Sequence, residues 1–203
     1  TTLTALSPLD GRYAQKLESL RDHFSEYGLI KRRVQVEIEW LKALAAAPQL
    51  AEIKPFSPAT VAELDGVVAG FSVADAEAIK TIEARTNHDV KAMEYWLKER
   101  LSANAEVMAA SEFIHFGCTS EDINNLSHAL MLQDARSSVL LPMLQKLVAR
   151  FRELAHELAP MAMLSRTHGQ PASPSTLGKE MANICARLER AAQRIGAVSL
   201  TAK

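Results

Sequence analysis

Residues 119–159, TSEDINNLSHALMLQDARSSVLLPMLQKLVARFRELAHELA, decide the fold, because apolar residues recur in this stretch at every third or fourth position. That spacing is typical of an amphipathic α-helix. At 1.5 Å per residue the pattern extends for about 60 Å, and we expect Pro142 to kink the helix. The apolar positions are Ile123, Leu126, Leu130, Leu140, Met143, Leu147, Phe151, Leu154 and Leu158.

A second long helix is predicted from Pro174 to the last residues, with Ser173 as its N-cap and no recognisable C-cap. Two helices of this length cannot bury each other's apolar faces without further partners of similar length. We therefore expect additional helices from a continuation of the chain beyond Lys203, from other copies of the chain, or from both. The apolar positions of the second helix are Leu177, Met181, Ile184, Leu188, Ala192, Ile195 and Val198.

Shorter helices are predicted before these two. A helix over residues 25–47 carries an apolar face and is stopped by Pro48. Further helices are predicted to begin near residues 57, 72 and 88. Strand candidates are almost absent, so the predicted fold class is all-α. The predicted domains are an N-terminal helical domain over 1–110 and the first part of a central long-helix bundle over 111–203.

The composition is ordinary for a soluble protein, with 48% hydrophobic and 23% charged residues and a net charge of -1. This charge gives no field that would attract nucleic acid or an anionic membrane surface. Because the sequence shows neither an apolar run of about 18 residues nor a charged-then-apolar leader, we expect a cytoplasmic protein. Cys118 and Cys185 lack CxxC spacing, which argues against a disulfide framework and a zinc ribbon.

Four polar stretches precede predicted helix starts and carry ionisable side chains. They are SPLDGRY (7–13), RTNHDVKA (85–92), HFGCTSEDINN (115–125) and SRTHGQPASPST (165–176). A helix N-terminus offers backbone N–H donors and the positive end of the helix dipole, which suit a phosphate or a carboxylate. In the last stretch we expect the helix start at Ser173 to hold His168 beside such an anion.

These residues also have a purely structural interpretation. Thr119 and Ser120 have the pattern of helix caps, and His115 lies among apolar neighbours like a core histidine. Lys91 and Arg12 fit solvated surface cations equally well. For His168 the surrounding Thr, Gly, Gln and Pro favour a functional role, but the pattern alone leaves the choice between catalysis and structure open.

The sequence contains no recognisable motif for binding a metal or a cofactor. No two histidines have the spacing of a helical zinc pair, and HExxH is absent. The sequence also lacks GxxxxGK[ST] and a GxGxxG that follows a strand. We therefore expect neither a metal nor a cofactor.

The four stretches resemble the bacterial type of the adenylosuccinate lyase family, within the fumarase and aspartase superfamily. The likeness runs from about Leu3 to Lys203 and rests on SRTHGQPASPSTLGKEMAN, HFGCTSEDINNLSHALML, TNHDVKAMEYWLKE and SPLDGRY. The TxHxQPA pattern marks the superfamily, whereas TSEDINN and NHDVKA point to this member.

The resemblance implies a homotetramer with a central bundle of long helices shared by the subunits. It implies β-elimination of fumarate from adenylosuccinate, which gives AMP, and the same cleavage of the succinyl-aminoimidazole-carboxamide ribotide. It also implies that His168 is the general acid that protonates the departing purine nitrogen. The residues implied to bind this small-molecule nucleotide substrate are Arg12, Tyr13, Asn87, His88, Asp89, Lys91, His115, Thr119, Ser120 and Thr167.

One family feature is missing from residues 1–203. The family's catalytic base is a serine on a glycine-rich loop reading roughly Ser-Ser-x-Met-Pro-x-Lys-x-Asn, and no such stretch occurs here. We therefore expect this chain to be the N-terminal portion of the enzyme and to be inactive by itself. Two alternatives stay open: another lyase of the superfamily, although its siblings give SPLDGRY no role as a phosphate contact, and a helical oligomerisation or ligand-binding module without turnover.

Overall fold

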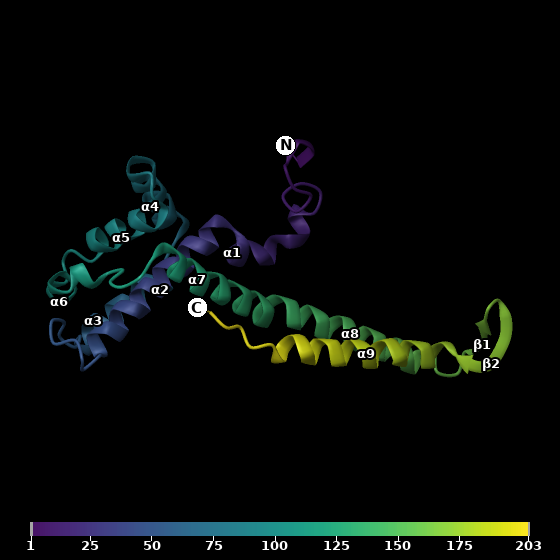
Figure 1. Ribbon diagram of the computed structural model, residues 1–203. Helices are drawn as coiled ribbons and strands as arrows, with labels where there is room; N and C mark the ends of the chain where they lie inside the picture. Colours follow the sequence, from purple (N-terminus) through teal and green to yellow (C-terminus); the bar gives the residue numbers. More distant parts are fainter. Residues whose placement is uncertain (1, 203) are drawn as a thin grey trace. The chain divides into compact units, whose positions relative to one another are not determined.

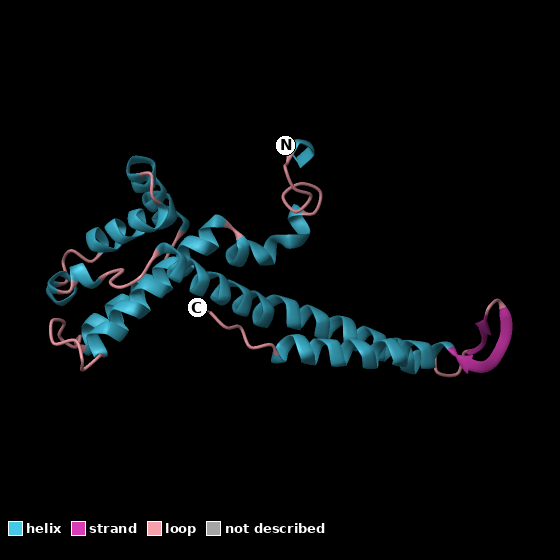
Figure 2. Ribbon diagram, viewed as in Figure 1, coloured by secondary structure: helices cyan, strands magenta, loops and turns pink. Residues whose placement is uncertain are grey.

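A computed structural model describes residues 2–202 as a helical protein with one two-stranded sheet (Figures 1 and 2). The predicted all-α class is confirmed, apart from that sheet. The chain forms two compact units, one of residues 2–132 together with 201–202 and the other of Gln133–Leu200. The predicted domain division after residue 110 concerns the domains of the whole protein and stays a prediction.

The first unit contains the helices that the caps predicted. Ser25 accepts a hydrogen bond from the Gly28 N–H, Ser57 from Thr60, and Ser72 forms a capping box with Asp75. The α-helices are α1 (Arg21–Phe24), α2 (Glu26–Ala46), α3 (Pro58–Ala69), α4 (Val73–Thr86), α5 (Asp89–Arg100), α6 (Ala105–Ala109) and α7 (Ser120–Ala135), which ends in the second unit. Short 3₁₀ turns are η1 (Thr2–Thr4), η2 (Ala14–Leu20) and η3 (Ser111–Phe113).

The core of the first unit is built around the apolar face of α2. Val34, Ile38 and Leu41 of this helix are almost fully buried among side chains from α3, α4, α5 and α7. At one end of the core, the ring of Phe71 stacks on Tyr27 and meets Trp96 edge-on. The other large buried side chains are Leu64, Ile79, Met93, Leu97, Leu101 and Ile123.

The second unit is an antiparallel helix pair joined by a β-hairpin. Its elements after α7 are the π-helical turn η4 (Arg136–Leu140), α8 (Leu141–Glu157), β1 (Ala162–Thr167), β2 (Gln170–Thr176) and α9 (Leu177–Ala197). Where a kink at Pro142 was expected, the structure has a π-helical turn that ends two residues before the proline. Proline lacks an N–H and its ring crowds the preceding turn, and a wider turn accommodates both.

The hairpin corrects two predictions, that strands are nearly absent and that a helix starts at Ser173-Pro174. Thr167 pairs with Gln170 and Leu164 with Pro174, and a register shift lies between these pairs. Prolines are tolerated here because a two-stranded sheet has only edge strands. The helix begins three residues later, where the Thr176 hydroxyl accepts a hydrogen bond from the Lys179 N–H at 3.1 Å.

The first amides of α9 bind the end of α8. The Leu177 N–H donates to the Met161 carbonyl and the Gly178 N–H to the Leu158 carbonyl, both at 3.0 Å. The first N–H groups of a helix have no acceptor within that helix. Here the first N–H groups of α9 donate to carbonyls at the end of α8 and in the turn that follows it. The expectation that the helix N-terminus faces His168 is therefore wrong.

The end of α9 also differs from the prediction, because the helix stops at Ala197 before the end of the chain. The guanidinium of Arg136 donates to the carbonyls of Ile195 at 3.3 Å and Val198 at 2.5 Å. A cation at the last carbonyls of a helix satisfies them and suits the negative end of the helix dipole. Arg136 therefore provides the C-cap that the sequence pattern did not reveal.

Candidate functional site

The junction between α4 and α5 gathers four of the predicted site residues. Asn87 ends α4 in the left-handed conformation, with φ of 53°. His88 is the N-cap of α5, and its Nδ1 accepts a hydrogen bond from the Lys91 N–H at 3.2 Å. His88 therefore caps the helix, and the other ring nitrogen of this exposed side chain stays available to a ligand.

Asp89, the first residue of α5, is fixed by an arginine from α2. Nη2 of Arg33 lies 2.7 Å from Oδ2 of Asp89, while Nε of Arg33 donates to the Asn124 side-chain oxygen at 2.8 Å. Burial by itself raises the pKa of Asp89, but the Val90 N–H and the Arg33 charge outweigh it and lower the pKa overall. Arg33 thus connects the NHDVK and SEDINN stretches across α2.

His115 is held by a buried carboxylate from the same helix. Its ring Nδ1 lies 2.5 Å from Oε1 of Glu37, and its backbone N–H donates to Oε2 at 3.1 Å. Burial raises the pKa of Glu37, although the hydrogen bonds from His115 oppose this rise. His115 has φ of 63°, a conformation that few residues other than glycine adopt. The ring is therefore neither loose nor an ordinary core histidine.

Lys91 does not present an isolated positive charge. Its Nζ lies 2.9 and 2.8 Å from the two oxygens of the buried Glu94, and it sits 5.3 Å from the centre of the Tyr95 ring. The hydrogen bond with Glu94 raises the pKa of Lys91, so the ammonium form is stabilised. Lys98 binds the same carboxylate at 3.4 Å. Glu94 is therefore shared by two cations.

Thr119 and Ser120 stand at the start of α7. The Thr119 N–H and hydroxyl both bind Oδ2 of Asp122, at 2.8 and 2.9 Å. This is the reciprocal half of a capping box. Ser120 is the first helical residue, where backbone N–H groups lack intrahelical partners. The structure thus combines the capping interpretation of Thr119 with a helix start that can receive an anion.

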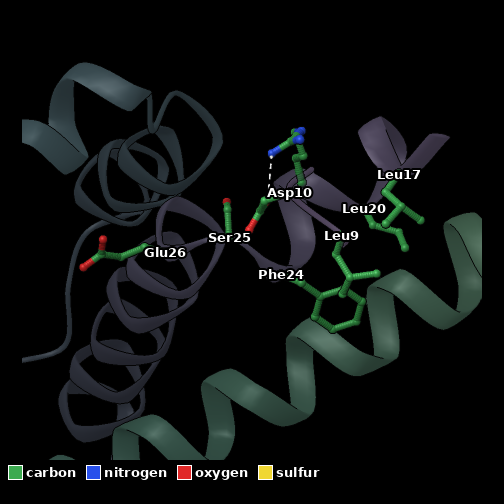
Figure 3. Close-up of a pocket in the computed structure, with 8 residues that line it drawn as sticks. Leu9, Asp10, Leu17, Leu20, Phe24, Ser25 and Glu26 are labelled. Carbon is green, nitrogen blue, oxygen red and sulfur yellow. Dashed lines mark ion pairs between the residues drawn. The ribbon is translucent and has the colours of Figure 1, made fainter. Parts of the chain in front are cut away.

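Arg12 and Tyr13 lie in the turn before η2, and both are exposed. The guanidinium carbon of Arg12 stands 5.5 Å from the centre of the Tyr13 ring, as in a cation–π pair. A pocket of about 430 Å³ nearby is lined by other residues (Figure 3), namely Leu9, Asp10, Leu17, Leu20, Arg21, Phe24, Ser25 and Glu26. Because two carboxylates and one guanidinium line it, this pocket does not suit a phosphate.

Thr167 and His168 belong to the second unit. Thr167 ends β1, and His168 and Gly169 form a two-residue turn in which both residues have positive φ, 49° and 78°. Such a turn has the conformation of type I′, which matches the twist of a β-hairpin. His168 is exposed at the hairpin tip. The pairing of β1 with β2 therefore places the His168 imidazole at the tip of the hairpin.

Four residues of the first unit were missed by the sequence analysis: Arg33, Glu37, Glu94 and Asn124. Three of them are charged and buried, with 9%, 1% and 5% of the residue surface exposed for Arg33, Glu37 and Glu94. Buried charges without partners are rare in proteins. The available signal was the placement of Arg33 and Glu37, four residues apart, next to the apolar positions Val34 and Ile38 of α2.

Neither a metal cluster nor a membrane span occurs in the part of the chain that the structure describes. Over residues 2–202, no three His, Cys, Asp or Glu side chains group in a way that could hold a metal ion. Within the same range, none of the helices combines the length and the apolar character needed to cross a bilayer. Cys118 and Cys185 are both free thiols.

Residues 11–201 match the lyase family, so the chain belongs to that family. Its relatives include an adenylosuccinate lyase of Haemophilus influenzae, 60% identical over 190 residues that cover 94% of this chain and 42% of the relative. An adenylosuccinate lyase of Escherichia coli (strain K12) is 54% identical over 203 residues, which cover 100% of this chain and 44% of the relative. The chain thus spans 42–44% of the length of these relatives.

The fold is shared with a solved fumarate lyase from Mesorhizobium sp. BNC1. The TM-score is 0.65 at 21% sequence identity, over 88% of this chain and 39% of that one. At this identity the likeness concerns the fold alone.

Proposed function

We propose that the protein that contains this chain is an adenylosuccinate lyase, which eliminates fumarate from adenylosuccinate and from the succinyl-aminoimidazole-carboxamide ribotide. The observation that carries the proposal is the 54–60% identity to adenylosuccinate lyases over 94–100% of this chain. Of the polar stretches on which the family resemblance rests, those at 85–92 and 115–125 contact α2 in the first unit, and that at 165–176 forms most of the hairpin of the second.

His168 is proposed as the general acid of this reaction. Elimination from a substituted purine needs a proton at the departing nitrogen, which would otherwise be a poor leaving group. An imidazole suits this task because its unperturbed pKa, about 6.5, lies close to neutral pH. The exposed hairpin tip supports the role, since it leaves His168 open to solvent and to a ligand.

The substrate contacts proposed in the first unit are the residues implied by the family resemblance: Arg12, Tyr13, Asn87, His88, Asp89, Lys91, His115, Thr119 and Ser120. Thr167 is proposed to assist at the hairpin. The ion pair of Arg33 and Asp89 and that of Lys91 and Glu94 neutralise much of the local charge. We infer that phosphate recognition relies on Arg12, His88 and backbone donors more than on Lys91.

We also propose that the enzyme is a homotetramer of the cytoplasm and that residues 1–203 alone do not turn over. Support for association comes from the second unit, where an apolar stripe at the end of η4 and on α8 stays exposed: Leu140, Met143 and Leu147, with 41%, 59% and 44% of each residue accessible. Ile184 and Ile195 of α9 are exposed as well. Helices with such faces need further helical partners.

Replacement of His168 in the full-length protein tests the proposed acid. We expect His168→Ala to lower kcat by about 10²- to 10⁴-fold and to change substrate affinity less, because a general acid acts mainly in the transition state. His156→Ala is a matched control, since His156 is another exposed histidine of the second unit, on α8. Near-normal kcat for His168→Ala would remove His168 from this role.

A further inference from the structure

The loop at residues 115–117 is tied to α2 by two side chains one helical turn apart. Glu37 accepts a hydrogen bond from the His115 backbone N–H and lies within hydrogen-bond distance of the ring Nδ1 of the same residue. The indole N–H of Trp40 donates to the Phe116 carbonyl at 2.8 Å. Both His115 and Gly117 have positive φ, 63° and 72°. A histidine in this conformation persists only where its surroundings enforce it.

The two oxygens of Glu37 determine which ring nitrogen of His115 carries a proton. With Glu37 ionised, as the hydrogen bonds from His115 favour, its oxygens can only accept, so Nδ1 at 2.5 Å from Oε1 is the donor. In the neutral imidazole the other nitrogen, Nε2, then has a lone pair. The carboxylate side chain of Glu37 is fully buried, whereas 21% of the His115 side chain is accessible. Water therefore competes little for Glu37.

We propose that Glu37 is a positioning residue for His115, which fixes the ring in the tautomer with Nδ1–H and directs Nε2 to the ligand. This inference rests on the proposed function, in which His115 contacts the nucleotide. In this tautomer Nε2 carries a lone pair, so it can accept a hydrogen bond from a hydroxyl or amino group of the ligand. The other neutral tautomer, with its proton on Nε2, could not accept that bond.

The variant Glu37→Gln changes the hydrogen-bonding groups that face His115 and leaves the shape of the side chain almost unchanged. The amide has one acceptor oxygen, and the His115 backbone N–H can donate only to that oxygen. The NH₂ group then faces Nδ1, which must accept, so the neutral ring takes the Nε2–H tautomer. Trp40→Phe is the matched control, because it removes the other bond from α2 to the loop without touching the ring.

Histidine-selective ¹⁵N NMR of the protein reads the tautomer directly, and the chain has only six histidines. We expect Nδ1–H at His115 in the wild type and in Trp40→Phe, and Nε2–H in Glu37→Gln. The wild-type spectrum decides the first claim even if a variant fails to fold. An Nε2–H tautomer in the wild type, or the same tautomer in the wild type and Glu37→Gln, would overturn the proposal.

Affinity for AMP tests the consequence for the ligand. We expect Glu37→Gln to weaken AMP binding about 10-fold, because the Nε2–H tautomer cannot accept the hydrogen bond from the ligand. In a His115→Gln background the same change should have no effect, because Glu37 acts through His115. An equal loss in both backgrounds would overturn the positioning role. If the wild type binds no AMP while the tautomers behave as expected, the proposed function fails and the assignment of the ring stands.

Discussion

Gly178 brings the backbone of α9 close to the end of α8 and the turn after it, and adding one methyl group there should separate the two helices. A Cβ at this position would lie 2.4 Å from the Ala155 carbonyl oxygen and 2.5 Å from the Ala159 nitrogen. Both atoms belong to the backbone, so no side-chain rotation relieves the overlap. To reach an ordinary contact of 3.4 Å, the backbones must move apart by about 1.0 Å, the difference between 3.4 and 2.4 Å.

The cost of Gly178→Ala follows from three contributions. Overpacking of this kind destabilises by about 1–3 kcal/mol. Weakening of the hydrogen bond from the Gly178 N–H to the Leu158 carbonyl costs about 1 kcal/mol more. The higher helix propensity of alanine returns about 1 kcal/mol. We therefore expect the second unit to lose about 1–3 kcal/mol of stability. This loss corresponds to a rise of about 5- to 150-fold in the equilibrium constant for opening of α8 and α9.

Gly196→Ala is the matched control, because the residue lies in the same helix but its added Cβ would be 3.5 Å from the nearest atom, Cδ1 of Leu141. This substitution should be neutral or stabilise by up to about 1 kcal/mol. Hydrogen exchange measured by mass spectrometry, at one protein concentration for all variants, reports the opening of α8 and α9 separately from the first unit. Unchanged protection of α8 and α9 in Gly178→Ala would refute the close packing on which the argument depends.

Three further experiments test the proposed site and assembly. The protein should bind AMP much better than adenosine by calorimetry, since the cation of Arg12 and the helix start at Thr119 offer bonds to phosphate; equal affinities would show that these residues do not contact it. Purified residues 1–203 should sediment as a dimer or larger without converting adenylosuccinate, and a monomer at high concentration or steady turnover would contradict this. Because the pKa of Asp89 is lowered in the folded state, its bond to Arg33 stabilises above the unfolded-state pKa of about 3.9 and is lost as the pH falls below it. The stability difference between wild type and Asp89→Asn should therefore be constant near pH 6 and shrink below pH 4 in urea titrations; a difference that persists at low pH would show that the ion pair is not its source.

The helices of the first unit could be predicted because their signals are local. Ser57 followed by Pro58, and Ser72 three residues before Asp75, specify a helix start within one turn of chain. The hairpin was missed because its signals conflict. Pro174 after Ser173 is as typical of a helix start as of an edge strand, and the turn has histidine where asparagine is the usual residue.

The candidate site was predictable only in part. His88, Asp89 and Thr119 stand out because they lie in polar stretches at helix starts. The partners of Asp89 and His115 are Arg33 and Glu37, which come from the middle of α2, where a search for apolar periodicity treats a charge as part of the solvent face. Which helix packs against a polar stretch depends on contacts between residues 56 to 91 positions apart, and a single sequence does not contain that information.

The hydrogen bonds that join the start of α9 to the end of α8 also close the base of the hairpin. Leu177 and Gly178 fix the register of the two helices through Met161 and Leu158, so this register does not depend on how many residues lie between. Adding one paired residue to each strand would move the turn outward by about 3.3 Å and leave the helix pair unchanged. The reach of His168 is thus set by strand length, and it is adjustable by adding two residues to each strand, since one added residue per strand would turn the side chains of the tip to the opposite face.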